Sequence, residues 1–124
     1  MQRIKVMVVE DSRVASVMLS RALEAEGFTV VAFDDGLDAY QRGLEGDIDL
    51  VLLDHLLPGM LGTEVLHRWR SEGITFPVIM ISNVTGEEEV TRALTLGARD
   101  YVRKPFSTRE LMARVRIQLD GVHG

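Results

Sequence analysis

Short apolar runs alternate along the chain with longer segments in which apolar residues recur every three or four positions. The runs are rich in branched side chains and do not alternate between apolar and polar residues, which favours strands buried on both faces of a parallel sheet. We therefore predict strands at Ile4–Val9, Phe28–Phe33, Asp49–Leu53, Pro77–Ile81 and Asp100–Arg103.

The longer segments predict helices from Ser12 to about Glu26, from Asp35 or Asp38 to near Gly46, from about Gly62 to Glu72, from Thr85 to Gly97, and from Ser107 onward. Serine and aspartate at the first position of a helix are favoured N-caps. Thr85 with Glu88 and Ser107 with Glu110 also have the spacing of a capping box. In the first helix, Val14, Val17, Met18 and Ala22 lie on one apolar face.

The resulting order is a strand followed by a helix, repeated five times without a linker or repeat. This alternation predicts one α/β domain over residues 1–124, with a doubly wound, five-stranded parallel sheet and five helices on its two faces. In such sheets the ligand site lies beyond the carboxyl ends of the strands. Candidate functional residues should therefore follow the apolar runs directly.

Polar residues do follow these runs. Glu10 and Asp11 follow the first run, Asp54 the third, Ser82 the fourth and Lys104 the fifth. Each has an ordinary explanation when taken singly, because an acid or serine after a strand commonly caps a helix or forms a turn. Several acids at one buried edge are much harder to explain as structure alone.

Clustered carboxylates repel one another unless cations intervene. Lys104 supplies one positive charge, and oxygen ligands beside it suggest Mg²⁺, which binds through a few carboxylates and retains waters. The absence of cysteine and of paired histidines argues against zinc. A carboxylate such as Asp54 beside Mg²⁺ and a lysine can accept a phosphoryl group as an aspartyl phosphate. The Ser82 hydroxyl would then bind a phosphate oxygen.

The composition bears on possible partners and on the location of the protein. The net charge of −5 and the pI of about 5.1 argue against a basic nucleic-acid-binding face. No apolar run approaches the roughly 20 residues that a membrane span requires. The amino end enters a strand without a signal peptide, which favours a cytoplasmic location.

Four motifs together resemble a response-regulator receiver domain, the phospho-acceptor half of two-component signalling. They are E-D after the first strand, D-x-x-x-P-G-M from Asp54 to Met60, Ser82 closing the fourth strand, and D-Y-V-x-K-P-F from Asp100 to Phe106. The resemblance covers essentially the whole chain. It implies a flavodoxin-like sheet in the order 2-1-3-4-5.

The resemblance also implies residue roles. Asp54 would be phosphorylated by a histidine kinase or phosphotransfer protein, and Lys104 would pair with the phosphoryl group. Ser82 would be the switch hydroxyl, and Tyr101 would turn inward as Ser82 moves, reshaping the face made by the fourth helix, fifth strand and fifth helix. The implied Mg²⁺ ligands are the carboxylates of Glu10, Asp11 and Asp54 and the backbone carbonyl of Leu56.

The end of the chain is similar to receivers fused to winged-helix DNA-binding domains. In that branch, residues at the positions of Asp100, Glu110 and Arg114 pair across a symmetric homodimer. Arg99 and Val90 depart from the pattern, because an acid and a basic residue are usual there. The resemblance therefore leaves the homodimer as a hypothesis.

Two neighbours of the site carry further expectations. Leu56 and Val84 stand two residues after Asp54 and Ser82, respectively. In the family, the side chains at these two positions flank the phosphoryl group and influence the rate of its hydrolysis. Neither apolar side chain can position an attacking water, so we expect a long-lived phosphoryl group. His55 is expected to be a solvated loop residue.

Two alternative functions remain. An interaction module that works without phosphorylation would not need the complete set of polar residues at the strand ends. An Asp-nucleophile phosphatase would need a second acid where Leu56 stands, and usually a cap domain. We therefore expect a signalling phospho-acceptor rather than a conventional enzyme. The cognate kinase, the output, and whether the domain stands alone or belongs to a longer regulator stay open.

Overall fold

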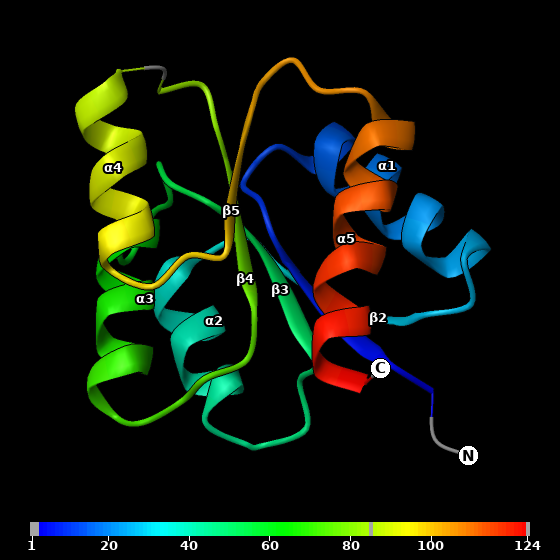
Figure 1. Ribbon diagram of the computed structural model, residues 1–124, viewed down its shortest axis with the longest axis horizontal. Coiled ribbons are helices and arrows are strands. Elements are labelled where there is room, and N and C mark those ends of the chain that lie inside the picture. Colours follow the sequence, from blue (N-terminus) through cyan, green and yellow to red (C-terminus); the bar gives the residue numbers. More distant parts are fainter. Residues whose placement is uncertain (1–2, 85, 124) are drawn as a thin grey trace.

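A twisted parallel sheet forms the centre of the molecule (Figure 1). The computed structural model describes residues 3–84 and 86–123, and within these residues the sheet has five strands in the order β2-β1-β3-β4-β5. The predicted fold class and strand order are confirmed. The elements are β1 (Lys5–Val9), α1 (Arg13–Ala25), β2 (Thr29–Phe33), α2 (Gly36–Gly43), β3 (Leu50–Asp54), α3 (Gly62–Ser71), β4 (Val78–Ser82), α4 (Glu87–Thr95), β5 (Asp100–Arg103) and α5 (Thr108–His123).

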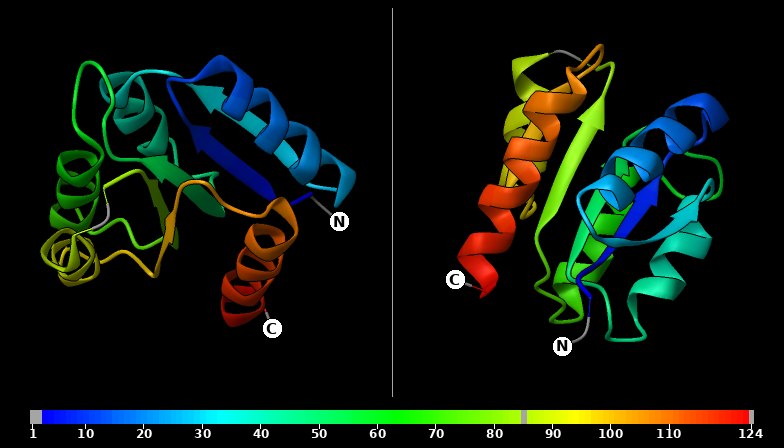
Figure 2. Two further views of the ribbon diagram at one scale, coloured as in Figure 1. Left: turned by 90° about the horizontal axis from the view of Figure 1, so that it is seen from above. Right: turned by 90° about the vertical axis from the view of Figure 1, so that its right-hand side faces the viewer.

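Helices cover both faces of the sheet, as the two views of Figure 2 show. Alternate strand residues point to opposite faces. On one face, Met7 and Val51 pack with residues of α2, α3 and α4, and on the other, Val8 and Leu52 pack with residues of α1 and α5. Both sets are almost fully buried, which explains why the strands read as continuous apolar runs.

Two strands extend one residue beyond their predicted ends. Asp54 is the last residue of β3 and pairs with Ile81 of β4, and Ser82 is the last residue of β4. The prediction stopped at the first polar residue, whereas strand pairing uses the backbone and does not require an apolar side chain. Both polar side chains are therefore held by regular strand structure rather than by a loop.

The predicted N-caps of the first two helices are confirmed. The Ser12 hydroxyl accepts a hydrogen bond from the Ala15 N–H at 3.3 Å. Asp35, rather than Asp38, caps α2, and its carboxylate accepts from the N–H groups of Leu37 and Asp38. These caps satisfy backbone donors that a helix leaves free at its start.

The two predicted capping boxes differ from expectation. Thr85 lies outside the described residues, and the N-cap of α4 is Gly86, which has no side chain to accept a hydrogen bond. At α5, the Ser107 hydroxyl accepts from the Glu110 N–H at 3.2 Å, while the Glu110 carboxylate pairs with Arg114. In the second box, therefore, only the hydrogen bond to the serine hydroxyl forms, because the Glu110 carboxylate pairs with the Arg114 guanidinium instead.

Most of the apolar face predicted for α1 faces outward, whereas Ala22 is half-buried and packs against the core. Val14 is 73% exposed and Met18 50% exposed, whereas Leu19 and Leu23 are buried against the sheet. Helical periodicity identifies residues that share a face but not what covers them.

No helix within residues 3–84 and 86–123 combines the length and apolar character needed to cross a membrane.

Candidate functional site

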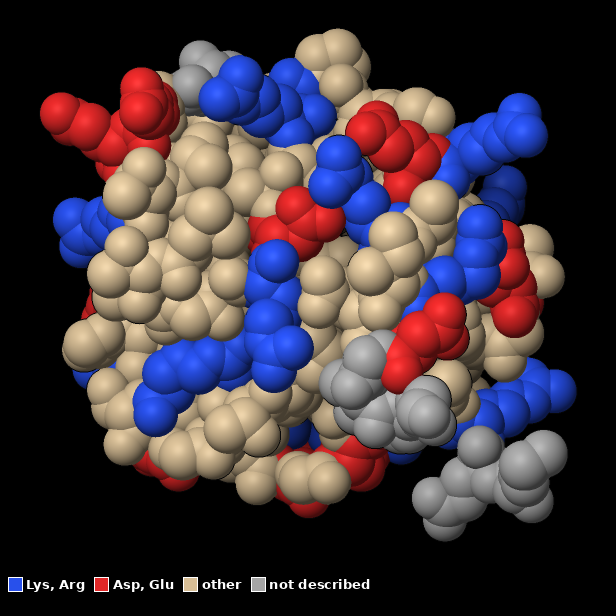
Figure 3. Space-filling model, viewed as in Figure 1, with Lys and Arg blue, Asp and Glu red and all other residues tan. Residues whose placement is uncertain are grey.

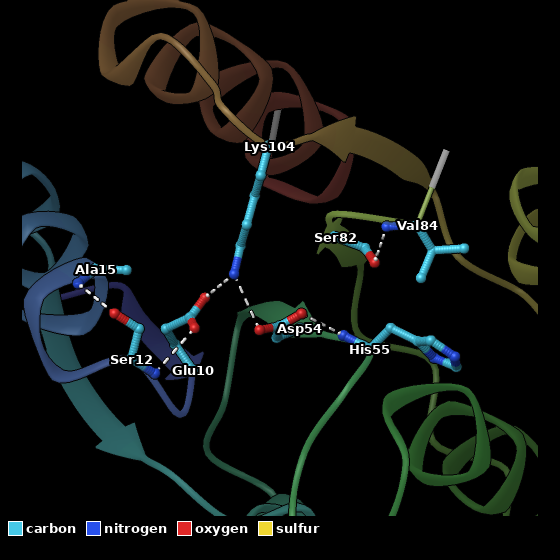
Figure 4. A network of polar contacts seen from close by, with 8 residues as sticks. All are labelled: Glu10, Ser12, Ala15, Asp54, His55, Ser82, Val84 and Lys104. Atoms are coloured by element: carbon cyan, nitrogen blue, oxygen red, sulfur yellow. Dashed lines mark hydrogen bonds and ion pairs between the residues drawn. The ribbon is translucent and has the colours of Figure 1, made fainter. Parts of the chain in front are cut away.

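The carboxyl ends of β1, β3, β4 and β5 bring the predicted site residues to one edge of the sheet (Figure 4). Glu10, Asp54 and Ser82 are buried, and Asp11 is exposed. Figure 4 shows Asp54 with Glu10 and Lys104 on one side and Ser82 on the other. The parallel pairing of the strands places these residues together although they are far apart in the sequence.

Glu10, Asp11 and Asp54 form an acidic cluster in which each residue offers one carboxylate oxygen, all within 4.8 Å of one another. Buried like charges at this spacing are unfavourable without compensation. The cluster supplies hard oxygen donors and one exposed carboxylate that reaches solvent, a donor set suited to a divalent cation such as Mg²⁺.

Lys104 contributes positive charge to this cluster. Its ammonium group donates hydrogen bonds to Glu10 Oε2 at 2.8 Å and to Asp54 Oδ2 at 3.0 Å. Burial on its own lowers the pKa of Lys104, but the two carboxylates more than offset this effect and hold the pKa above its ordinary value. Lys104 is therefore a cation at neutral pH, placed directly beside the candidate acceptor.

The backbone around Asp54 is tightly constrained. The His55 N–H donates to Asp54 Oδ1 at 2.7 Å, so the two carboxylate oxygens of Asp54 have different partners. A Cβ atom at Gly62 would clash with the backbone carbonyl oxygen of Asp54, and Gly59 has a φ of 82° in the turn that precedes α3. Glycine is needed at both positions for α3 to begin close to the end of β3.

Ser82 and Tyr101 are joined through one residue of the β4–α4 loop. The Ser82 hydroxyl accepts a hydrogen bond from the Val84 N–H at 3.0 Å. The Tyr101 hydroxyl donates to the Val84 carbonyl oxygen at 2.9 Å. A displacement of this loop would therefore act on both side chains at once.

The predicted flanking residues lie near the site but differ in exposure. The Leu56 side chain is 57% exposed and Val84 is half-buried. Among the described residues, no hydrogen bond uses the carbonyl oxygen of Leu56. This oxygen is thus free of competing protein donors.

The expectation that His55 is solvated is wrong, and one contact of Lys104 was not predicted. The His55 side chain is only 12% exposed, with Nε2 3.9 Å from Glu89 Oε2 in the first turn of α4. This burial depends on how α4 packs, so no sequence pattern near His55 indicates it. The direct bond between Lys104 and Glu10 was also not predicted, since strand ends indicate a shared edge but not individual partners.

Asp100, Glu110 and Arg114 are brought together within a single chain. The Arg114 guanidinium contacts Asp100 Oδ2 at 2.9 Å and Glu110 Oε1 at 3.1 Å. Hydrogen bonds to these two acids raise the pKa of Arg114. The three residues expected to pair between protomers therefore already pair inside one protomer.

Comparison with known proteins agrees with this geometry. Residues 6–116 match the family model described as the response regulator receiver domain. The chain is 47% identical over 117 residues to the phosphate regulon transcriptional regulatory protein PhoB of Rhizobium meliloti, covering 93% of this chain and 52% of PhoB. It is 36% identical over 115 residues to the transcriptional regulatory protein CusR of Escherichia coli K12, covering 93% of this chain and 51% of CusR.

The fold agrees as well. The structure of the Francisella response regulator 1452 receiver domain superposes with a TM-score of 0.93 at 28% identity, covering 97% of this chain and 99% of that one. The chain spans about half the length of PhoB and CusR, so the similarity concerns one part of each regulator. Because the family model matches most of the chain, this protein belongs to the response regulator receiver domain family.

Proposed function

We propose that this domain is the phosphorylation-controlled switch of a two-component system, with Asp54 as the phospho-acceptor. The observation that carries the proposal is the contact of the Lys104 ammonium with both Glu10 and Asp54 inside the acidic cluster. A structural ion pair would need one acid, whereas this arrangement leaves negative charge for a metal ion. The same arrangement disfavours an interaction module that works without phosphorylation.

Mg²⁺ would be held by the carboxylates of Glu10, Asp11 and Asp54 and by the backbone carbonyl of Leu56. The acidic cluster and the uncommitted Leu56 carbonyl support this assignment. When bound, the ion would neutralise charge on the phosphoryl oxygens. Without it, one lysine faces a cluster of carboxylates, so phosphorylation should require the ion.

In the proposed reaction, an Asp54 carboxylate oxygen attacks the phosphorus of a phosphohistidine on a histidine kinase or phosphotransfer protein. The oxygen–phosphorus bond forms as the phosphorus–nitrogen bond breaks, and the electron pair returns to the histidine ring. Lys104 stabilises the charge on the transferred group because its ammonium already lies 3.0 Å from Asp54 Oδ2. The His55 N–H fixes the orientation of the other oxygen.

The phosphodonor protein is proposed to dock on the exposed face of α1. Val14 and Met18 line a surface pocket together with Lys104, Pro105 and Phe106. This surface is mostly apolar and continuous with Lys104, so a protein bound there would reach Asp54. The docking surface therefore supports a macromolecular phosphodonor rather than a small phosphoester substrate.

Phosphorylation is proposed to act on the output through Ser82 and Tyr101. A phosphoryl group on Asp54 would attract the Ser82 hydroxyl, which would then leave the Val84 N–H. The Val84 carbonyl oxygen also accepts a hydrogen bond from the Tyr101 hydroxyl. The β4–α4 loop and the face of α4, β5 and α5 would therefore shift together. Residues 1–124 act as one domain in this proposal.

The output is proposed to involve the regulation of transcription, as the names of PhoB and CusR suggest. A homodimer through α4, β5 and α5 is part of the proposal. Its formation would require Arg114 to exchange or share the acids that it now contacts within its own chain.

Intact mass spectrometry tests the proposal directly. The protein is incubated with acetyl phosphate, with and without Mg²⁺, beside an Asp54→Asn variant. We expect one phosphoryl adduct in the wild type with Mg²⁺, and none without Mg²⁺ or in the variant. Beryllofluoride binding, measured in parallel, distinguishes rapid hydrolysis from failure to react. Absence of both the adduct and beryllofluoride binding would refute the proposed chemistry.

A further inference from the structure

A groove lies at the amino-terminal edge of the sheet, opposite the acidic cluster. The loops before β3 and β4 border it, and both lie at the lower edge of the molecule in Figure 1. Its volume is about 450 Å³, within the range of roughly 300–1,000 Å³ that is common for ligand sites. None of the phosphorylation chemistry proposed above uses this groove.

About half of the lining of the groove is apolar. It includes Leu44, which is 46% exposed, and the partly or fully buried side chains of Ile48, Ile74, Phe76 and Pro77. The ring of Phe76 is fixed by an edge-on contact with buried Trp69, with ring centroids 4.8 Å apart. A ligand would therefore meet a preformed apolar surface, which reduces the entropic cost of binding.

Positive charge without a carboxylate partner lies at the β4–β5 end of this groove. Arg99 lines the groove and is exposed, and no hydrogen bond or ion pair between described residues uses its side chain. Nearby Arg70 donates to the backbone carbonyl oxygens of Gly97 and Ile74, which are neutral. Burial, and then repulsion from Arg99, lower the pKa of Arg70.

Acidic residues at the same edge are engaged elsewhere. Asp47 pairs with Arg42 and Lys5, which together hold its pKa far below the ordinary value. Asp49 lines the groove, but its carboxylate accepts the backbone N–H of Lys5 in β1. Arg99 precedes β5, two strands away from β3 in the sheet order, a separation of about 10 Å. The groove is therefore polarised, with its cation at the β5 end.

We propose that this groove binds an acidic segment of a protein partner, in which an aliphatic or aromatic side chain lies next to a carboxylate. The side chain would occupy the surface formed by Leu44, Ile74 and Phe76, and the carboxylate would pair with Arg99. This role accounts for the basic residue at position 99. Because the groove is remote from Asp54, partner binding is separable from phosphorylation.

Matched peptides test this surface. The probes are acetyl-Glu-Leu-Phe-Glu-amide, its neutral analogue with glutamine in place of glutamate, and its basic analogue with lysine. Each is titrated into ¹⁵N-labelled protein, and backbone amide shifts are followed at Gly46, Thr75 and Arg99. We expect saturable shifts at these amides, with the acidic peptide binding about threefold more tightly than the neutral one, as for an exposed ion pair. The basic peptide should bind most weakly.

Two variants and a control locate the interaction. In Arg99→Gln, the acidic and neutral peptides should bind with equal affinity. In Leu44→Glu, the affinity for the acidic peptide should fall more than the affinity for the other two peptides. Arg103→Gln, at the other end of β5 and also exposed, should leave the preference unchanged. Absence of saturable binding, equal binding of the acidic and neutral peptides, or an undiminished preference in Arg99→Gln would overturn the proposal. Mass spectrometry with acetyl phosphate, run on the same variants, tests the phosphorylation chemistry separately.

Discussion

The Tyr101 hydroxyl donates a hydrogen bond to the backbone carbonyl oxygen of Val84 at 2.9 Å. Tyr101 lies on β5 and Val84 follows β4, so this bond ties the β4–α4 loop to the neighbouring strand. Basic side chains lie beside acidic ones near the middle of the face shown in Figure 3, and charged side chains also lie over α5. A change at Val84 would therefore reach β5 directly through the Tyr101 hydroxyl.

Replacing Tyr101 with phenylalanine should separate switching from chemistry. The Tyr101→Phe variant loses the bond to Val84, and the free energy of unfolding should fall by about 1 kcal/mol. The mass adduct with acetyl phosphate should persist, because Tyr101 does not touch Asp54. Tyr40→Phe is the control. The Tyr40 hydroxyl donates to exposed Glu72, so losing this hydrogen bond should lower the free energy of unfolding by less than in Tyr101→Phe. Loss of the adduct in Tyr101→Phe would place this residue in the chemistry instead.

Much of the fold could be predicted because the strands are apolar runs and the helices begin at recognisable caps. Ser12 and Asp35 cap their helices through local contacts that sequence spacing reveals. The outward face of α1 could not be predicted, because periodicity does not show that Leu19 rather than Val14 meets the sheet. Tertiary packing decides such questions.

The candidate site was predictable for a related reason. Parallel strands bring their carboxyl ends to one edge, so polar residues after apolar runs must converge. Individual partners were not predictable, and the bond between Lys104 and Glu10 spans most of the chain. The burial of His55 depends on the first turn of α4, and the pairing of Arg114 with Asp100 depends on how α5 packs beside β5.

The phosphoryl group should be long-lived, because Leu56 cannot position water. Leu56→Asn should accelerate its hydrolysis about tenfold, since one additional hydrogen bond to the attacking water is worth roughly 1.4 kcal/mol in the barrier. Loss of the adduct is followed by intact mass in buffer that contains Mg²⁺. Leu94→Asn, on α4 and similarly exposed, should have no effect. Rapid hydrolysis in the wild type would contradict this expectation.

Activation should produce a dimer if Arg114 exchanges its intrachain partners for those of a second copy. Sedimentation velocity with saturating beryllofluoride and Mg²⁺ should then show a dimer in the wild type. Asp100→Asn should weaken dimerisation, because Arg114 would then have one carboxylate fewer to pair with in the second copy. The exposed Asp120→Asn substitution on α5 serves as a charge-matched control. A monomeric wild type under these conditions would contradict the proposed dimer.

The packing of α2 against α3 should be sensitive to one added methyl group. A Cβ atom at Gly43 would lie 2.6 Å from Trp69 Nε1, within a fully buried indole that also donates to the Tyr40 carbonyl oxygen. Gly43→Ala should reduce the free energy of unfolding by about 1–3 kcal/mol through overpacking. Gly86→Ala, where a Cβ meets open space, should cost less than about 1 kcal/mol. Equal denaturation midpoints for the two variants would argue against the close contact.

The proposed switch depends on phosphorylation of Asp54. Borohydride reduction after acetyl phosphate treatment with Mg²⁺ identifies the phosphorylated residue. Borohydride converts an aspartyl phosphate to homoserine, which peptide sequencing by mass spectrometry assigns to one position. We expect homoserine at position 54 alone. Homoserine at position 11, or an unmodified residue 54 in protein that carries the phosphoryl adduct, would contradict it.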